Sequence, residues 1–165
     1  MAYYPLENYV VEQAIEDTST TQKHQLGEII RAYDSTFGVG EFIYLVGVAS
    51  TAIGSLVTYN AVTYQTALAA VGANKPQPIA VAMSANLAAG YGWYQISGIA
   101  VCKKTCTVSL AANAAVGVLT TGLVAGTGSG KEILGALVAT VASAKAGVVS
   151  VRVVVNRPHM QGRVT

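Results

Sequence analysis

Residues 125–132, Ala-Gly-Thr-Gly-Ser-Gly-Lys-Glu, have the composition of a loop that could hold a phosphate group. A phosphate-binding loop places Gly before four residues and then Gly-Lys-Ser/Thr. Its backbone N–H groups and lysine then surround the phosphate, and its hydroxyl binds magnesium. Here Ala125 stands at the first glycine position, and Glu132, which repels phosphate, stands at the hydroxyl position. We therefore interpret the segment as an exposed connection between strands.

Histidine and carboxylate side chains are few and scattered. The two histidines, His24 and His159, have no acidic residues at a spacing typical of a catalytic triad or a metal cluster. Beyond residue 41 the chain has one carboxylate, Glu132, so chemistry with paired carboxylates would need a second one from the N-terminal segment. The sequence thus predicts that the protein is not an enzyme and that it holds no cofactor or metal.

Cys102 and Cys106 frame a Lys-Lys-Thr tripeptide. In one continuous strand they would lie about 13 Å apart, too far for a disulfide, whereas across a tight loop they could meet. With no further cysteine and no histidine nearby, we interpret them as two buried or partly buried thiols.

The aromatic pair Trp93 and Tyr94 could stack on a sugar if it were exposed, but Tyr91-Gly-Trp-Tyr94 alternates across the two faces of a strand, which favours core packing for Trp93. Nucleic acid is not an expected partner, because the basic residues are scattered and an acidic segment opposes binding. A membrane is not expected either. The three uncharged stretches, residues 42–74, 76–102 and 106–130, are interrupted by polar residues and turn formers.

Charge divides the chain into two parts. Seven of the eight acidic residues lie in residues 1–41 beside only Lys23 and Arg31, which gives this part a charge of −5. The remaining 124 residues carry Glu132 and eight basic residues, which gives +7. This asymmetry predicts an acidic N-terminal arm, residues 1–27, a β-rich body, residues 28–156, and a basic C-terminal tail, residues 157–165. A short helix within residues 7–17 is possible, and the arm could lie on its own body or on a neighbour's.

Alternating apolar residues predict strands throughout the body. Residues 149, 151, 153 and 155 are valines that face one way, while Ser150 and Arg152 face the other, as in a half-buried strand. Residues 41–48 are apolar on both faces, which indicates a strand covered on both sides. Residues 61–74 are ambiguous between a helical turn and a long loop. Repeated Ala-x-Gly turns between these runs favour an all-β fold, a compact β-barrel or β-sandwich body with an extended N-terminal arm.

Three segments resemble small structural proteins of tailed bacteriophages, in particular head decoration (capsid cement) proteins. They are residues 31–49 (RAYDSTFGVGEFIYLVGVA), 79–90 (IAVAMSANLAAG) and 93–100 (WYQISGIA). The resemblance covers residues 28–155 and rests on composition and turn pattern. It implies a virion protein on the outer surface of the phage head, where it clamps subunits of the major capsid protein, often as a trimer. It carries no set of functional residues.

A cementing role would need an apolar or neutral contact surface and an arm that crosses subunit boundaries. The expected assembly contacts are Tyr3, Tyr4 and Tyr9 in the arm and Phe42 and Tyr44 in the first apolar strand. The alternatives are a phage tail, collar or head-fibre component, or a carbohydrate-binding β-domain displayed on the particle. A buried Trp93 with a projecting arm would favour cementing, and an exposed Trp93 would favour sugar binding.

Overall fold

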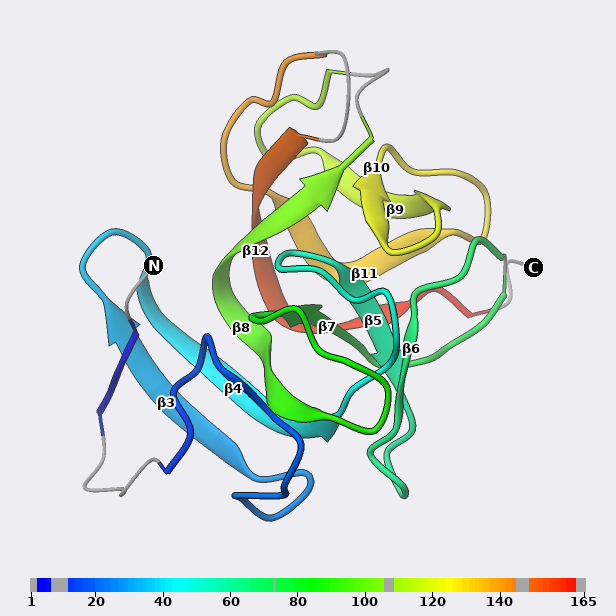
Figure 1. Ribbon diagram of the computed structural model, residues 1–165. Coiled ribbons are helices and arrows are strands. Elements are labelled where there is room, and N and C mark those ends of the chain that lie inside the picture. The colour runs from blue at the N-terminus through cyan, green and yellow to red at the C-terminus, as the bar shows by residue number, and fades with distance from the viewer. Residues whose placement is uncertain (1–2, 7–11, 73, 106–108, 145–148, 163–165) are drawn as a thin grey trace.

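The computed structural model describes residues 3–6, 12–72, 74–105, 109–144 and 149–162, and these residues form strands, turns and loops without a helix (Figure 1). The strands are β1 (Tyr4–Pro5), β2 (Thr18–Ser19), β3 (Ile29–Asp34), β4 (Gly38–Val46), β5 (Leu56–Tyr59), β6 (Thr66–Leu68), β7 (Ile79–Ala82), β8 (Tyr91–Lys104), β9 (Ala115–Thr120), β10 (Leu123–Ala125), β11 (Glu132–Val138) and β12 (Val149–Met160). The predicted all-β fold class is confirmed. Over these ranges no helix is long and apolar enough to cross a membrane.

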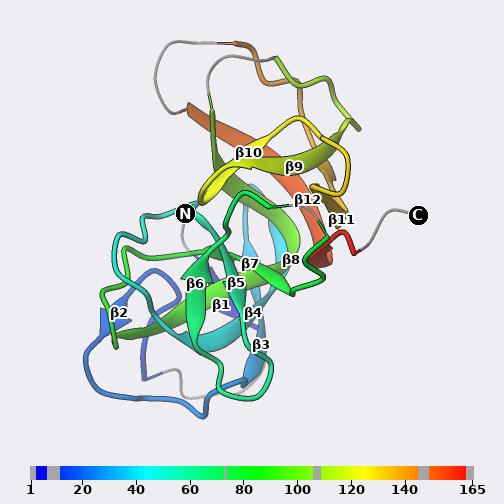
Figure 2. The same cartoon turned by 90° about the vertical axis from the view of Figure 1, so that its right-hand side faces the viewer.

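Strand β8 joins two groups of strands. Along its first half it pairs with β4 on one edge and with β7 on the other, so that Gln95 lies between Phe42 and Val81. From Ser97 to Lys104 it pairs with β12. Figure 2 shows the two groups one above the other, with β8 passing between them. The long apolar run of β8 is consistent with this position, because a strand shared by two cores buries residues along its whole length.

The first group is a closed barrel. Its strand order, β8-β10-β9-β11-β12, returns to β8 through the β8–β12 pairing, and closure leaves no free sheet edge on this path. Val151, Val153 and Val155 of β12 point into the barrel core, whereas Ser150 and Arg152 point outward, as their alternation predicted. The core is filled largely by β-branched residues, which pack well on a pleated surface.

The second group packs β4, β5, β6 and β7 around the first half of β8. Ile43, Leu45, Val57, Tyr94 and Ile96 form its core. Strand β6 lies in residues 61–74, the segment that the sequence left ambiguous, and pairs with β5. Residues 66–68 therefore form a strand where a helical turn was considered, and the described residues from 69 to 77 form a loop.

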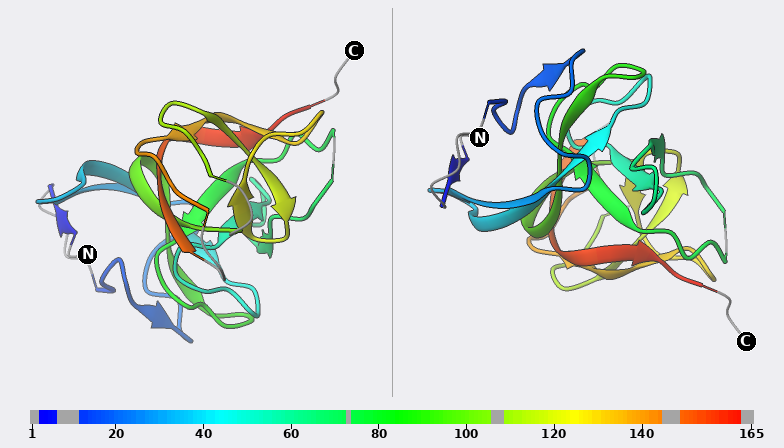
Figure 3. Two further views of the ribbon diagram at one scale, coloured as in Figure 1. Left: turned by 90° about the horizontal axis from the view of Figure 1, so that it is seen from above. Right: turned by 90° about the horizontal axis from the view of Figure 1, so that it is seen from below.

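The β3–β4 hairpin extends to one side of the barrel, with the N-terminal segments along it (Figure 3). One face of this hairpin and of β8 carries a third apolar cluster, in which Tyr3 and Ile15 of the arm cover Phe42, Tyr44 and Trp93. Strand β4 is thus apolar on both faces, as residues 41–48 predicted, because the second core covers one face and the arm covers the other.

The described part of the arm, residues 3–6 and 12–27, lies on its own body. Strand β1 pairs with β3, and β2 pairs with β8. Residues 7–11 of the suggested helix over residues 7–17 lie outside the described residues, and residues 12–17 form bends and turns. The arm therefore docks at both of its described ends.

Residues 157–160, expected to belong to the C-terminal tail, are part of strand β12. Strand β12 continues through Met160 and pairs with β11, with Leu134 opposite His159. Pro158 and Met160 are buried, which explains why the strand does not stop at residue 156. Between β8 and β9, Leu110 forms a single bridge with Ala142.

Candidate functional site

The five expected assembly contacts do not share one surface. Tyr3, Phe42 and Tyr44 are buried in the cluster between arm and body. Tyr4 is 66% exposed, and Tyr9 lies outside the described residues. The first three side chains therefore hold the arm to its own body, and of this set Tyr4 is the described residue that a partner could reach.

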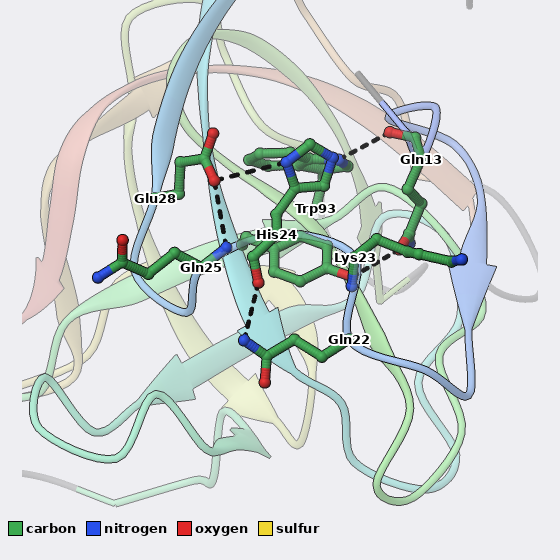
Figure 4. Close-up of polar contacts among 8 residues, drawn as sticks. Gln13, Gln22, Lys23, His24, Gln25, Glu28 and Trp93 are labelled. Carbon is green, nitrogen blue, oxygen red and sulfur yellow. Dashed lines mark hydrogen bonds and ion pairs between the residues drawn. The ribbon is translucent and has the colours of Figure 1, made fainter. Parts of the chain in front are cut away.

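Gln13 fixes the arm to the body. Its side-chain Nε2 donates hydrogen bonds to the main-chain oxygens of Asp17 at 3.0 Å and Tyr91 at 2.9 Å, and its Oε1 accepts one from the Tyr44 hydroxyl at 2.6 Å. Its main-chain oxygen accepts a bond from Trp93 Nε1 at 3.0 Å (Figure 4). A buried glutamine with these partners is satisfied only while the arm is docked.

His24 packs on the same cluster. Its ring centroid lies 4.9 Å from that of Trp93 and 5.2 Å from that of Tyr44, and its side chain is 8% exposed. Its Nδ1 lies 3.4 Å from Glu28 Oε2, and its buried Nε2 has no hydrogen-bond partner among the described residues (Figure 4). A histidine and a carboxylate could orient each other for acid–base catalysis, but such a pair needs a nucleophile or substrate within hydrogen-bond reach. Here the rings of Trp93 and Tyr44 lie against the buried imidazole of His24, so the His24–Glu28 pair holds the arm to the body.

The other sequence candidates for chemistry are apart from one another. The loop over residues 126–131 joins β10 to β11, so it lacks the following helix of a phosphate-binding loop. Cys102 is buried in the barrel, and burial raises the pKa of its thiol to about 12. Within the described ranges, no three His, Cys, Asp or Glu side chains lie close enough together to hold a metal ion.

Sequence reasoning missed one buried cation. Lys104 is fully buried at the end of β8, where its Nζ donates hydrogen bonds to the main-chain oxygens of Thr105 at 3.0 Å and Ser143 at 3.5 Å. Its place in the alternation of β8, two residues after the buried Cys102, is the signal that could have identified it.

The exposed face of the β3–β4 hairpin carries apolar side chains around Arg31, which lies opposite Glu41. Tyr4, Tyr33 and Val39 are directly opposite one another on β1, β3 and β4, so they share this face, and they are 66%, 45% and 42% exposed. Leu6 and Ile29 are also exposed at this end of the molecule. We call the exposed surface of Tyr4, Leu6, Ile29, Tyr33 and Val39 the hairpin face. Arg157 of β12 contacts Glu41 of β4 at 3.1 Å and so links the hairpin to the barrel.

Comparisons of the chain with protein-family models, with curated proteins and with solved structures find no match. Trp93 and Tyr94 are both fully buried, so neither can stack on a sugar in this structure. The described residues of the arm, on the other hand, pack against the body and do not project from it. The structure thus has the buried Trp93 that was expected for cementing, but it lacks the projecting arm over the described residues.

Proposed function

We propose that this protein is a virion structural protein that decorates the phage capsid and cements it by non-covalent bracing of major capsid protein subunits. The observation that carries the proposal is the hairpin face, where five apolar side chains stand exposed on one strand face around Arg31. Exposed apolar side chains gathered on one face, with polar residues among them, are typical of a protein contact. The resemblance to head decoration proteins supplies the partner and the location, the outer surface of the head.

A rigid support favours this use of the hairpin face. The opposite face of the same strands is packed by the arm, and the Glu41–Arg157 ion pair joins β4 to β12. A surface that is held in place before binding loses less conformational entropy when it docks. Repetition of a modest contact around a closed shell then stabilises the shell through multivalency. Trimer formation by the decorating protein belongs to the proposal and is measurable by light scattering.

The test is co-sedimentation of purified protein with phage heads that lack it. A Tyr33→Glu substitution should reduce attachment at least about tenfold, because a carboxylate would be buried against an apolar surface. The matched control is Val62→Glu, at a valine that is 85% exposed in the loop after β5. Undiminished attachment of the Tyr33 variant, with the control also bound, would refute the role of the hairpin face.

Removal of the acidic arm, residues 1–27, would be a less informative test of attachment. It would uncover Phe42, Tyr44 and Trp93, so a loss of attachment could follow from a disturbed fold. Copy number separates decoration from the alternatives. A ratio to the major capsid protein near one supports decoration, whereas a few dozen copies or fewer per particle would favour a tail, collar or head-fibre component.

A further inference from the structure

A groove of about 670 Å³ lies between the tip of the β3–β4 hairpin, the loop that follows β11 and the outer side of β12. Its lining includes apolar, hydroxyl and basic side chains: Phe37, Val101, Val141, Ser143, Ser150 and Arg152. The hairpin tip and the loop after β11 lie on the same side of the molecule in Figure 1. No residue of the hairpin face lines the groove, whereas Phe37 lines it and also packs against the apolar cluster beneath the arm.

Arg152 is the charged group of this groove. It points outward from β12, and its guanidinium carbon lies 5.2 Å from the centre of the Phe37 ring. Stacking on an aromatic ring holds a guanidinium in a fixed orientation while its N–H groups stay available. Lys103 of β8 is the cross-strand neighbour of Ser150, so a second cation belongs to the β8–β12 ladder beside the groove.

Acidic residues do not balance these two cations. None lines the groove, and the ion pairs found among the described residues are His24–Glu28 and Glu41–Arg157. Asp34, in the same hairpin as Phe37, is buried and accepts hydrogen bonds from the N–H groups of Thr36 and Phe37. The groove thus combines apolar walls with positive charge, a combination that fits a carboxylate carried by an apolar segment.

We propose that this groove binds an extended segment of a partner protein, in which a Glu or Asp side chain pairs with Arg152 and the flanking apolar side chains pack on Val101 and Val141. If the protein cements a shell as proposed above, the segment belongs to a neighbouring capsid subunit, and in this respect the inference rests on that function. A twofold contact between two copies of this surface is disfavoured, because it would set Arg152 and Lys103 of one copy against those of the other.

The surface next to the groove gives such a segment a path. Beyond Arg152 on β12, Val154 is exposed and lies between Ile99 of β8 and Leu137 of β11 as a direct cross-strand neighbour of both. This apolar row continues the groove wall along the barrel. Nucleic acid suits the surface less well, because backbone recognition of nucleic acid uses clustered cations and exposed aromatic platforms.

The test uses the full chain, labelled with nitrogen-15, and a peptide of alternating Val and Glu, five residues long, acetylated and amidated at its ends. Amide shifts in NMR spectra should change at residues 37, 101, 140–143 and 149–152. A matched Val/Gln peptide should bind the unaltered protein at least about fivefold more weakly, and the Val/Glu peptide should bind an Arg152→Gln variant at least about fivefold more weakly. Each change removes a charge-assisted hydrogen bond. Arg31→Gln, at an exposed arginine of β3 that does not line the groove, is the control and should bind the peptide as the unaltered protein does.

Equal binding of the Val/Glu and Val/Gln peptides, or shifts confined to other residues, would overturn the proposal. So would tighter binding of a single-stranded oligothymidine to the same residues, which would assign the groove to nucleic acid. Dispersed spectra of each variant establish that it is folded. Because no phage particle takes part, failure here leaves the attachment assay with Tyr33→Glu to decide the proposed function separately.

Discussion

The indole Nε1 of Trp93 donates a hydrogen bond of 3.0 Å to the main-chain oxygen of Gln13, which lies 80 residues earlier in the chain. This bond joins the acidic N-terminal segment to the strand shared by both groups of the fold. Trp93 is also the chain's single tryptophan, so its fluorescence reports on the docked arm without added label.

Replacement of Gln13 by Ala should loosen the arm. The substitution removes three side-chain hydrogen bonds and deprives the Tyr44 hydroxyl of its acceptor, so we expect the free energy of unfolding to fall by about 2 kcal/mol. Acrylamide quenching of Trp93 fluorescence should increase, and urea titration should give the loss of stability.

Gln22→Ala is the control for this effect. Gln22 is exposed and its side chain donates one hydrogen bond, to the main-chain oxygen of His24 at 2.9 Å, so its loss should change stability by less than about 0.5 kcal/mol. If both variants behave alike, Gln13 does not anchor the arm.

Gly98→Ala should be costly. Gly98 has φ +98° where β8 passes from β4 to β12, and an added Cβ would lie 2.6 Å from the main-chain oxygen of Val39. We expect a loss of about 2–3 kcal/mol from backbone strain and the clash together. At Gly38, φ is +76° but nothing lies within 4 Å of the added Cβ, so Gly38→Ala should lose only about 1 kcal/mol. Thermal unfolding of the two variants measures the difference, and equal losses would show that the contact with Val39 is unimportant.

Stability should fall in alkali because of Cys102. Burial raises the pKa of this thiol from 9.0 to about 12, so above pH 9 the unfolded chain loses the proton while the folded chain keeps it. The contribution of Cys102 is therefore complete below pH 9 and declines as the pH rises toward 12, at up to about 1.4 kcal/mol per pH unit. Tyr3, whose pKa burial also raises to about 12, acts in the same direction at higher pH.

The Cys102→Ala variant isolates this thiol. Urea unfolding at pH 8, 9.5 and 10.5 should show a shallower decline for the variant than for a Cys106→Ser protein that retains Cys102. Parallel declines would mean that Cys102 does not stay protonated in the fold.

Replacement of Arg157 by Ala and by Gly should change the stability of the protein to different extents. Arg157 has φ +45° and is 64% exposed in its ion pair with Glu41, so the pair itself contributes less than about 1 kcal/mol. Arg157→Gly loses the same pair but relieves the left-handed backbone, and should be about 1 kcal/mol more stable than Arg157→Ala. Melting temperatures compare the two variants, and an Ala variant at least as stable as the Gly variant would contradict this account.

The local part of the fold could be predicted from the sequence. The alternation of Val151, Arg152 and Val153 determines both a strand and its inward face, because side chains on a strand alternate. The two-faced apolarity of β4 predicted cover on both sides. What the sequence could not identify was the cover, since a docked arm and a neighbouring subunit would leave the same apolar pattern on Phe42 and Tyr44.

Long-range pairing was beyond the reach of periodicity. Strand β6 has only three residues, too few for a periodic signal, and its partner β5 fixes it. The basic residues at the groove, Lys103 and Arg152, are far from Phe37 in the sequence. Only the folded chain therefore shows that Arg152 stacks on the Phe37 ring. Of the hairpin face, the sequence identified only Tyr4. The other four residues could not be identified, because the exposure of an apolar residue depends on what packs beside it in the fold.

Because β8 is a common wall of both strand groups, the protein cannot be cut into two independently expressible halves. A truncation on either side of Gly98 would leave one half without the strand that lines its core. Hydrogen exchange in the two cores should consequently proceed as one cooperative event. Insertions and gene fusions that respect the fold have to be placed in peripheral loops such as the one around Val62, where a graft would leave the shared wall whole.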